Sequence, residues 1–319
     1  MRLKIRSLCN FDKHPHAPNA YFDFLAPIIH PLETMSTSIC GHKVAISLKC
    51  AGGSNKQLIL NWRTFQATVR HQSSFVSSFD CAQSSGQWME DQDVHFVKAD
   101  YLLGTKISHN KPIVRLYNVA DLSRVIIERE YELPMPWSSA QLSFAPNVAL
   151  TGDAPPPARA LFYADPNTRI LALSATTGGT QQWLIARESF FRPTSRPDKQ
   201  IVPWTEWCNW CLIKNAPALV RDVQVVGNRI IYLEAQAEAI GRVSQQRIGM
   251  IEFPPYPDPR NAPKSPWFHV GPGAGMSMIP TESFKEVSSR VTQGEGISSI
   301  AATEDNIVLF LVSAILYCQ

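Results

Sequence analysis

Apolar and polar residues alternate along this chain as pairs of short apolar runs joined by a polar turn. Residues 94–97 lead through Ala99-Asp100 into residues 101–104, and residues 223–226 lead through Gly227-Asn228 into residues 230–233. The runs are rich in β-branched and aromatic residues. A polar pair between two such runs is typical of a β-hairpin. We therefore predict antiparallel hairpins along most of the chain.

The hairpins recur with a spacing that indicates repeats. Segments 58–64, 114–121, 170–176 and 248–253 share one strand-and-turn pattern, with 57 residues from Asn61 to Asn118 and 56 from Asn118 to Ser174. Repeated hairpins without helical periodicity predict an all-β, β-propeller-like fold with five to seven irregular blades. The spacing exceeds the ~40–45 residues of a WD-type blade, so either the loops are long or this register is displaced.

The patterning also divides the chain. Residues 1–40 form a poorly patterned N-terminal segment, and we assign residues 41–319 to a single β-propeller-like domain. The chain contains 24 prolines and 16 glycines, which suits many short strands better than long helices. We interpret the proline-rich stretch 253–266 as a stiff connection between blades.

Charge and hydropathy exclude several classes of protein. Thirty Lys and Arg residues against 27 Asp and Glu give a net charge of +3, so we expect no nucleic-acid partner. The longest apolar run, residues 307–318, is shorter than the ~20 residues of a membrane-spanning helix, so we expect no membrane partner. The basic N-terminus lacks the apolar core of a signal peptide, and the cysteine count is an odd seven. These features predict a cytoplasmic or nuclear protein.

The stretch WTEWCNWC, residues 204–211, contains a CxxC motif, which suggests a redox dithiol or half of a zinc site. No βαβ pattern surrounds Cys208 and Cys211, and the paired candidates for further zinc ligands, His14 with His16 and Cys40 with His42, are far away in the sequence and lack zinc-finger spacing. We therefore predict that these cysteines pack in the core, together with Trp204 and Trp207. We assign no metal and no cofactor.

Other candidate sites are also incomplete. The glycine-rich stretch 271–275 (GPGAG) lacks the third glycine of a dinucleotide-binding loop, so we interpret it as a turn. Asp91 and Asp93 lie close to His95 in sequence, but the chain contains no GxSxG nucleophile motif. We therefore assign no catalytic residues.

One segment has the composition of a binding surface. Residues 187–196 (RESFFRPTSR) mix three arginines with two phenylalanines. Arginine and tryptophan dominate binding hot spots in protein interfaces. We therefore predict a protein-binding rim formed by Trp137, Arg187, Arg192 and Arg196.

A series of short phrases, in a fixed order, resembles one family. The phrases are LNWRT (60–64), VHF (94–96), LLG (102–104), YELP (131–134), ADP (164–166), RESFF (187–191), PW (203–204) with Trp207, VGNR (226–229) and ATEDNIVLFL (302–311). They are similar to the C-terminal propeller-like region of the expanded F-box proteins of mushroom-forming (basidiomycete) fungi. They cover residues 55–312, but the chain contains no leucine-rich helical segment of the F-box type.

The resemblance implies a non-catalytic protein-interaction domain, either the substrate-recruiting part of an F-box-type ubiquitin-ligase receptor or a stand-alone scaffold. Its partners would be a target protein and the ubiquitin-ligase scaffold, and the family shares no catalytic residues that could be transferred to this chain. Two alternatives remain open from the residues alone. They are a propeller-based hydrolase or carbohydrate-binding protein, and a redox protein that uses the CxxC motif.

Overall fold

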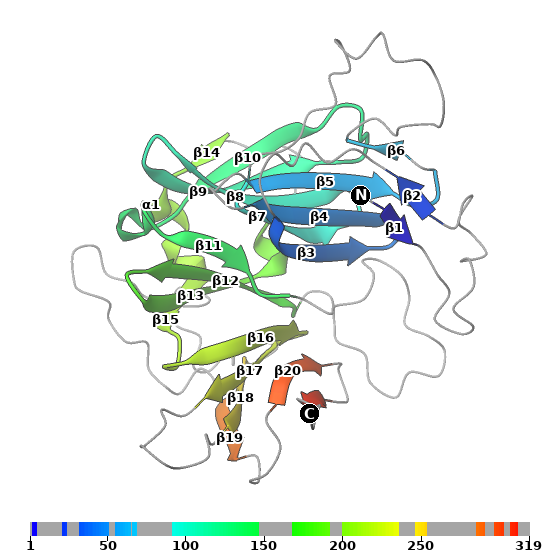
Figure 1. The fold of residues 1–319 in the computed structure, drawn as a ribbon. Coiled ribbons are helices and arrows are strands. Elements are labelled where there is room, and N and C mark those ends of the chain that lie inside the picture. The colour runs from blue at the N-terminus through cyan, green and yellow to red at the C-terminus, as the bar shows by residue number, and fades with distance from the viewer. Residues whose placement is uncertain are drawn as a thin grey trace. The chain divides into compact units, whose positions relative to one another are not determined.

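The fold is seen in a computed structural model of the chain (Figure 1). The residues that it describes are 2–4, 21–23, 32–50, 55–64, 66–68, 91–146, 168–191, 200–235, 246–253, 285–290, 297–302 and 307–311. Two compact units are present. The first comprises residues 1–143, 150–152 and 192–202, and the second comprises residues 144–149, 153–191 and 203–319.

The first unit is built on two antiparallel sheets of consecutive strands. The first sheet contains β3 (Leu32–Cys40), β4 (Lys43–Cys50), β5 (Asn55–Asn61) and β6 (Gln66–Ala67). The second contains β7 (Asp93–Lys98), β8 (Tyr101–Ser108), β9 (Lys111–Asn118) and β10 (Ile126–Glu132), with β14 (Ile201–Val202) parallel to β10 at its edge. β1 (Arg2–Lys4) and β2 (Tyr21–Asp23) pair separately, and a short 3-10 helix η1 (Met135–Trp137) follows β10.

The second unit repeats this plan. The third sheet contains β12 (Ile170–Thr177), β13 (Thr180–Arg187) and β15 (Cys211–Asn215), together with β11 (Gln141–Phe144), of which residues 141–143 belong to the first unit and Phe144 to the second. The fourth contains β16 (Val220–Val226), β17 (Arg229–Ala235), β18 (Gln246–Glu252) and β19 (Lys285–Arg290). A further pair is formed by β20 (Ile297–Ala302) and β21 (Ile307–Leu311).

These sheets confirm the predicted all-β, β-propeller-like fold, because each larger sheet has the up-and-down order of a propeller blade. The number of blades differs from the prediction. The described residues form four blades of four or five strands, against the five to seven expected. The hairpins predicted at Ala99-Asp100 and Gly227-Asn228 join the first two strands of their sheets, β7 to β8 and β16 to β17. At the latter turn Gly227 has φ +58°, which glycine adopts without strain.

Each of the four sheets is closed by the same backbone hydrogen bond. The residue after the third strand donates its N–H to the carbonyl of the residue before the second strand. The pairs are Trp62 to His42 (3.0 Å), Val119 to Asp100 (2.8 Å), Glu188 to Arg169 (3.0 Å) and Phe253 to Asn228 (2.9 Å). Every sheet therefore contains an equivalent position at the end of its third strand.

This equivalence corrects the repeat register that we predicted. Segments 58–64, 114–121 and 248–253 contain third strands, but segment 170–176 is the second strand of its sheet. The equivalent positions are Asn61, Asn118, Arg187 and Glu252. The regular 57-residue spacing therefore holds for the first step only, because the connection between β11 and β12 is long and displaces the third repeat.

Within each unit, the hydrophobic core lies between successive sheets. Because side chains alternate across a strand, neighbouring residues of β17 face different clusters. Ile230 and Tyr232 pack with β12 and β13, where the Trp183 ring lies 5.6 Å from that of Tyr232. Ile231 and Leu233 pack against β20. A strand covered on both faces has an almost continuously apolar sequence, as observed for residues 230–233.

The first strand of a sheet has an unpaired edge, and polar side chains of the preceding strands supply acceptors to it. In the first unit Asp91 N donates to Gln57 Oε1 (3.0 Å), Phe96 N to Ser38 Oγ (3.2 Å) and Leu142 N to Gln92 Oε1 (2.6 Å). In the second unit, Ile297 N donates to Gln246 Oε1 (2.5 Å) and Ile300 N to Asp222 Oδ2 (2.9 Å). Buried N–H groups are costly without acceptors, so these bonds fix the first sheet to the second in the first unit and the fourth sheet to β20 in the second unit.

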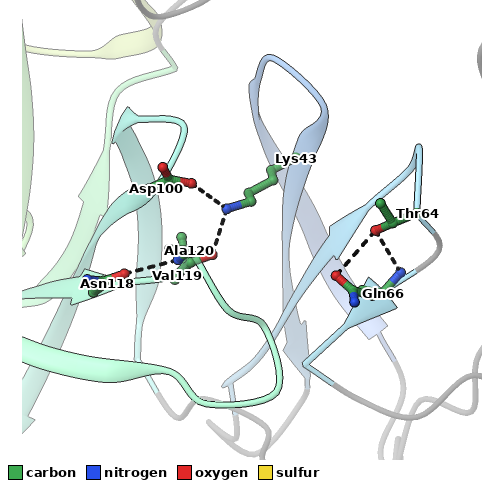
Figure 2. A network of polar contacts seen from close by, with 7 residues as sticks. All are labelled: Lys43, Thr64, Gln66, Asp100, Asn118, Val119 and Ala120. Atoms are coloured by element: carbon green, nitrogen blue, oxygen red, sulfur yellow. Dashed lines mark hydrogen bonds and ion pairs between the residues drawn. The ribbon is translucent and has the colours of Figure 1, made fainter.

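A buried lysine adds a second link in the first unit, shown in Figure 2. Lys43, at the start of β4, donates from Nζ to Asp100 Oδ1 and to the Val119 carbonyl, both at 2.7 Å. Both acceptors belong to the second sheet, on either side of its closing hydrogen bond. The Lys43 ammonium group therefore links the β3–β4 hairpin to the second sheet. Its buried charge is paired with the Asp100 carboxylate, as burial of a charge requires.

The expected boundary between the N-terminal segment and the domain at residue 40 stays a prediction. Strand β3 begins at Leu32, within the N-terminal segment 1–40 that we described as poorly patterned. The proline-rich stretch from residue 254 to 266 and the GPGAG segment lie outside the described residues. Among the residues that the structure describes, no helix has the length and apolar character needed to cross a bilayer.

We expect Gln57→Leu to lower the free energy of unfolding by about 3 kcal/mol. The substitution preserves side-chain volume, but the buried N–H and carbonyl of Asp91 lose their partners, at a cost of ~1–3 kcal/mol each. Urea denaturation followed by circular dichroism measures the effect. Gln66→Ala, on the exposed end of the same sheet, is the control and should change stability by less than ~0.5 kcal/mol. Equal effects of the two substitutions would contradict this role of Gln57.

Candidate protein-binding surface

The basic-aromatic segment begins where β13 ends. After Arg187 the chain enters a 3-10 helix, η2 (Glu188–Phe191), held by the closing hydrogen bond from Glu188 N to the Arg169 carbonyl. Glu188 and Phe191 are buried, whereas Phe190 is half-buried. The turn therefore directs one phenylalanine into the core and the other toward the surface.

A second element supplies the tryptophans. Pro203 precedes the one-turn helix α1 (Trp204–Trp207), and its φ of –62° is already compatible with a helix start. The 3-10 helix η3 (Cys208–Trp210) continues directly into β15. Residues three apart in such turns lie on the same side, so Trp204, Trp207 and Trp210 fall near one another.

The two elements meet in an aromatic cluster, which we define as Phe190, Phe191, Trp204, Trp207 and Trp210. Phe190 stacks on Trp207 at 5.7 Å between ring centroids and on Trp210 at 5.9 Å, with interplanar angles of 14° and 26°. The other contacts are edge-to-face: Phe191 meets Trp207 at 5.8 Å, and Trp204 meets it at 5.1 Å. Both arrangements are favourable for aromatic pairs. Trp207 is therefore the centre of the cluster.

The exposed fraction of the side chains differs across the aromatic cluster. Trp207 is 1% exposed and Phe191 is buried, whereas Trp210 is 43% exposed. Isolated exposed apolar side chains are common, but an exposed tryptophan stacked on a fixed phenylalanine is a rigid aromatic surface. This geometry makes Trp210 the candidate contact for a partner.

The predicted rim residues fall in different places. Trp137 lies in η1 of the first unit and is 2% exposed, so most of its ring packs inside that unit. Arg187 is half-buried at the end of β13 in the second unit, directly before η2. Arg192 and Arg196 lie outside the described residues. The rim as a set stays a prediction.

We did not predict Trp210, and we placed Trp204 in the core. The structure shows Trp204 half-buried and Trp207 fully buried. The three-residue spacing of the tryptophans was visible in the sequence, but it does not indicate which ring faces outward. That depends on Phe190, which is 14 residues before Trp204 in the chain.

The prediction that the CxxC cysteines pack in the core is confirmed. Cys208 and Cys211 are both buried thiols, and the Cys211 thiol lies 3.2 Å from the Cys208 carbonyl, to which it can donate. Burial raises the pKa of the Cys211 thiol, and the proximity of Cys208 adds to this effect. A reactive cysteine needs a stabilised thiolate, which these surroundings disfavour.

The described residues contain no group of three or more His, Cys, Asp or Glu side chains placed to hold a metal ion. His14 and His16, which we considered as zinc ligands, lie outside the described part of the chain.

Comparisons with known proteins give structural neighbours only. No family model matches the sequence, and no curated protein matches it. One similar structure is the β-propeller domain of the Trilobed protease from Pyrococcus furiosus, with 9% identity and a TM-score of 0.34 over 69% of this chain and 55% of that chain. Another is the WD40 domain of SCAP from fission yeast, with 10% identity and a TM-score of 0.35 over 84% of this chain and 54% of that chain. This chain thus spans little more than half the length of either neighbour.

We expect Trp207→Ala and Trp210→Ala to differ strongly in stability. Truncating the buried Trp207 leaves a cavity among Phe190, Phe191 and Trp204 and should cost ~3–5 kcal/mol. Truncating the exposed Trp210 removes one stacking contact and should cost about 1 kcal/mol. Urea denaturation of the two variants measures both costs. A loss at Trp210 as large as that at Trp207 would show that Trp210 is part of the core.

We expect the native protein to resist thiol modification at Cys211. Its sulfur is buried and its thiolate is disfavoured, so a maleimide should react there only after unfolding. Peptide mass spectrometry of protein labelled before and after denaturation measures this difference. Rapid labelling of Cys211 in the native protein would support the redox alternative instead.

Proposed function

We propose that this chain is a non-catalytic protein-interaction domain and that Trp210 contacts its protein partner. The observation that carries the proposal is the aromatic cluster, in which a 43%-exposed tryptophan is stacked on Phe190 above a buried Trp207. Tryptophan and arginine are the residues most enriched at binding hot spots. Arg187 begins the segment that carries Phe190, so both residue types occur in this part of the second unit.

The cluster suits binding because its outer ring is already ordered. A partner that covers Trp210 would gain the burial of the exposed part of a large apolar side chain. The stacking on Phe190 restricts the ring before binding, so little rotational freedom is lost on association. Rigid aromatic anchors of this kind give much of the affinity in protein interfaces.

We further propose that the partner is a target protein captured for an F-box-type ubiquitin ligase, or that the domain acts as a stand-alone scaffold. The support is the ordered series of phrases in this sequence that resemble those of the fungal F-box proteins. Two of these phrases, RESFF and PW with Trp207, contribute four of the five residues of the aromatic cluster. The fifth, Trp210, lies outside them.

We expect Trp210→Ala to abolish capture of the partner without unfolding the domain. Affinity purification of the tagged protein, with quantitative mass spectrometry, compares wild type with Trp210→Ala and with Ile126→Ala. Ile126 is a matched control, because it is 44% exposed and lies in the first unit. Calorimetry with the purified partner should show at least a ~30-fold weaker affinity for Trp210→Ala, as expected for a hot spot worth ~2 kcal/mol.

Two results would contradict this assignment. Unchanged affinity in Trp210→Ala would exclude the aromatic cluster as the contact. Binding of purified glycans at Trp210 in place of a protein would favour the carbohydrate-binding alternative.

The ligase link has its own test. A pull-down with the purified F-box-binding adaptor of the ligase measures direct association with this chain. Association would support the receptor, whereas no association would contradict direct recruitment by this chain and favour a scaffold. Neither result depends on Trp210.

A further inference from the structure

A buried carboxylate lies where the first two sheets of the first unit meet. Asp91 stands two residues before β7 and is 1% exposed. The Asp91 carboxylate accepts from the hydroxyl of Tyr117 on β9, whose Oη lies 2.9 Å and 3.1 Å from the two carboxylate oxygens. The Tyr117 ring belongs to the hydrophobic core between these sheets, where it packs with Phe96 and Leu102. Ionising such a group is costly unless its charge is fully compensated.

The backbone of Asp91 is held from the other sheet. Gln57 of β5 accepts from the Asp91 N–H at Oε1 (3.0 Å) and donates from Nε2 to the Asp91 carbonyl. The side chain of Asp91 thus contacts the second sheet while its backbone is bound to the first. A change in the charge of this carboxyl therefore acts directly on the junction of the two sheets.

Gly104 leaves the space that this pair occupies. A β-carbon at residue 104 would stand 2.7 Å from Asp91 Cγ and 2.8 Å from Tyr117 Cε2, both too close for a carbon–carbon contact. Gly104 lies in β8, next to β9, which carries Tyr117, and to β7, which begins two residues after Asp91. The glycine therefore lets the carboxyl and the phenol meet.

The second unit holds the same glutamine arrangement without a carboxyl. Gln246 donates from Nε2 to the Ile297 carbonyl (2.8 Å) and accepts from the Ile297 N–H, as Gln57 does with Asp91. Ile297 is buried within an apolar cluster. The residue whose backbone pairs with the glutamine can therefore be apolar, as Ile297 is. The carboxyl of Asp91 is not needed for this pairing.

The charges around Asp91 do not offset its burial. Burial raises the pKa of the Asp91 carboxyl to about 6, and the charge of Glu130 on β10 adds to the rise. The Tyr117 hydrogen bond, Arg115 on β9 and Lys106 on β8 lower this pKa by lesser amounts. Arg115 is itself paired with Glu130, with Nε 2.7 Å from Oε1, which explains its limited effect.

We propose that Asp91 makes the junction of the first and second sheets sensitive to pH, with the protonated carboxyl stabilising the junction and its ionisation loosening it. Because the folded pKa lies above the ordinary value of 3.8, the stabilisation is complete below pH 4. It is lost as pH rises through about 6. In this window the folded state holds a proton that the unfolded state has released.

Hydrogen exchange at residues 91–98 measures the opening of this junction. After correction for the intrinsic pH dependence of exchange, wild-type protection should fall about tenfold per pH unit between pH 4 and 6, about 100-fold in all, relative to Asp91→Asn. Asp121→Asn, at an exposed aspartate of the same unit, is the matched control and should keep the wild-type slope. Parallel profiles for wild type and Asp91→Asn would overturn the proposal.

A second variant keeps the proposal testable if Asp91→Asn does not fold. Tyr117→Phe removes a hydrogen bond that favours the carboxylate, so the midpoint of the profile should move to higher pH. The wild-type amide resonances of Asp91 and of the Gln57 side chain should also titrate together near pH 6. An unchanged midpoint in Tyr117→Phe, or titration of these resonances near pH 4, would overturn the proposal.

Discussion

The structure depends on satisfying backbone N–H groups along the free edges of first strands such as β7 and β20. A blade that packs face to face with its neighbour cannot continue the hydrogen bonding of the neighbouring sheet, so the edge of β7 or β20 needs acceptors from elsewhere. Side chains from the preceding strands supply them, most clearly Gln57 and Gln246. Their amide groups carry both a donor and an acceptor, and so match both the N–H and the carbonyl of one residue.

This constraint also explains why the core is distributed between the sheets. Once a glutamine fixes the edge of the next sheet, the alternating side chains of a strand such as β17 meet two different neighbours. Both faces of the central part of such a strand are then apolar, as for residues 230–233 of β17. Asp91 is one of the buried polar residues.

The sequence predicted the hairpins and the fold class well, because both depend on local alternation and turn residues. Gly227-Asn228 and Ala99-Asp100 are such cases. It did not predict the register of the third sheet, since the short β11 is separated from β12 by a long connection and carries little pattern of its own. The roles of Gln57 and Gln246 were also invisible, because a glutamine within an apolar strand resembles any half-buried polar residue. Trp210 was missed for a similar reason: its exposure is decided by Phe190, on another element.

The hydrogen bond that closes each sheet joins two backbone atoms, and the four residues that accept it are His42, Asp100, Arg169 and Asn228. These side chains are all polar but differ in charge and shape, so the bond itself does not require one particular amino acid at that position. Four blades with the same geometry can therefore diverge in sequence until no internal repeat is recognisable by residue identity. An origin of the blades by duplication would therefore be visible in the hydrogen-bonding register and not in residue identity.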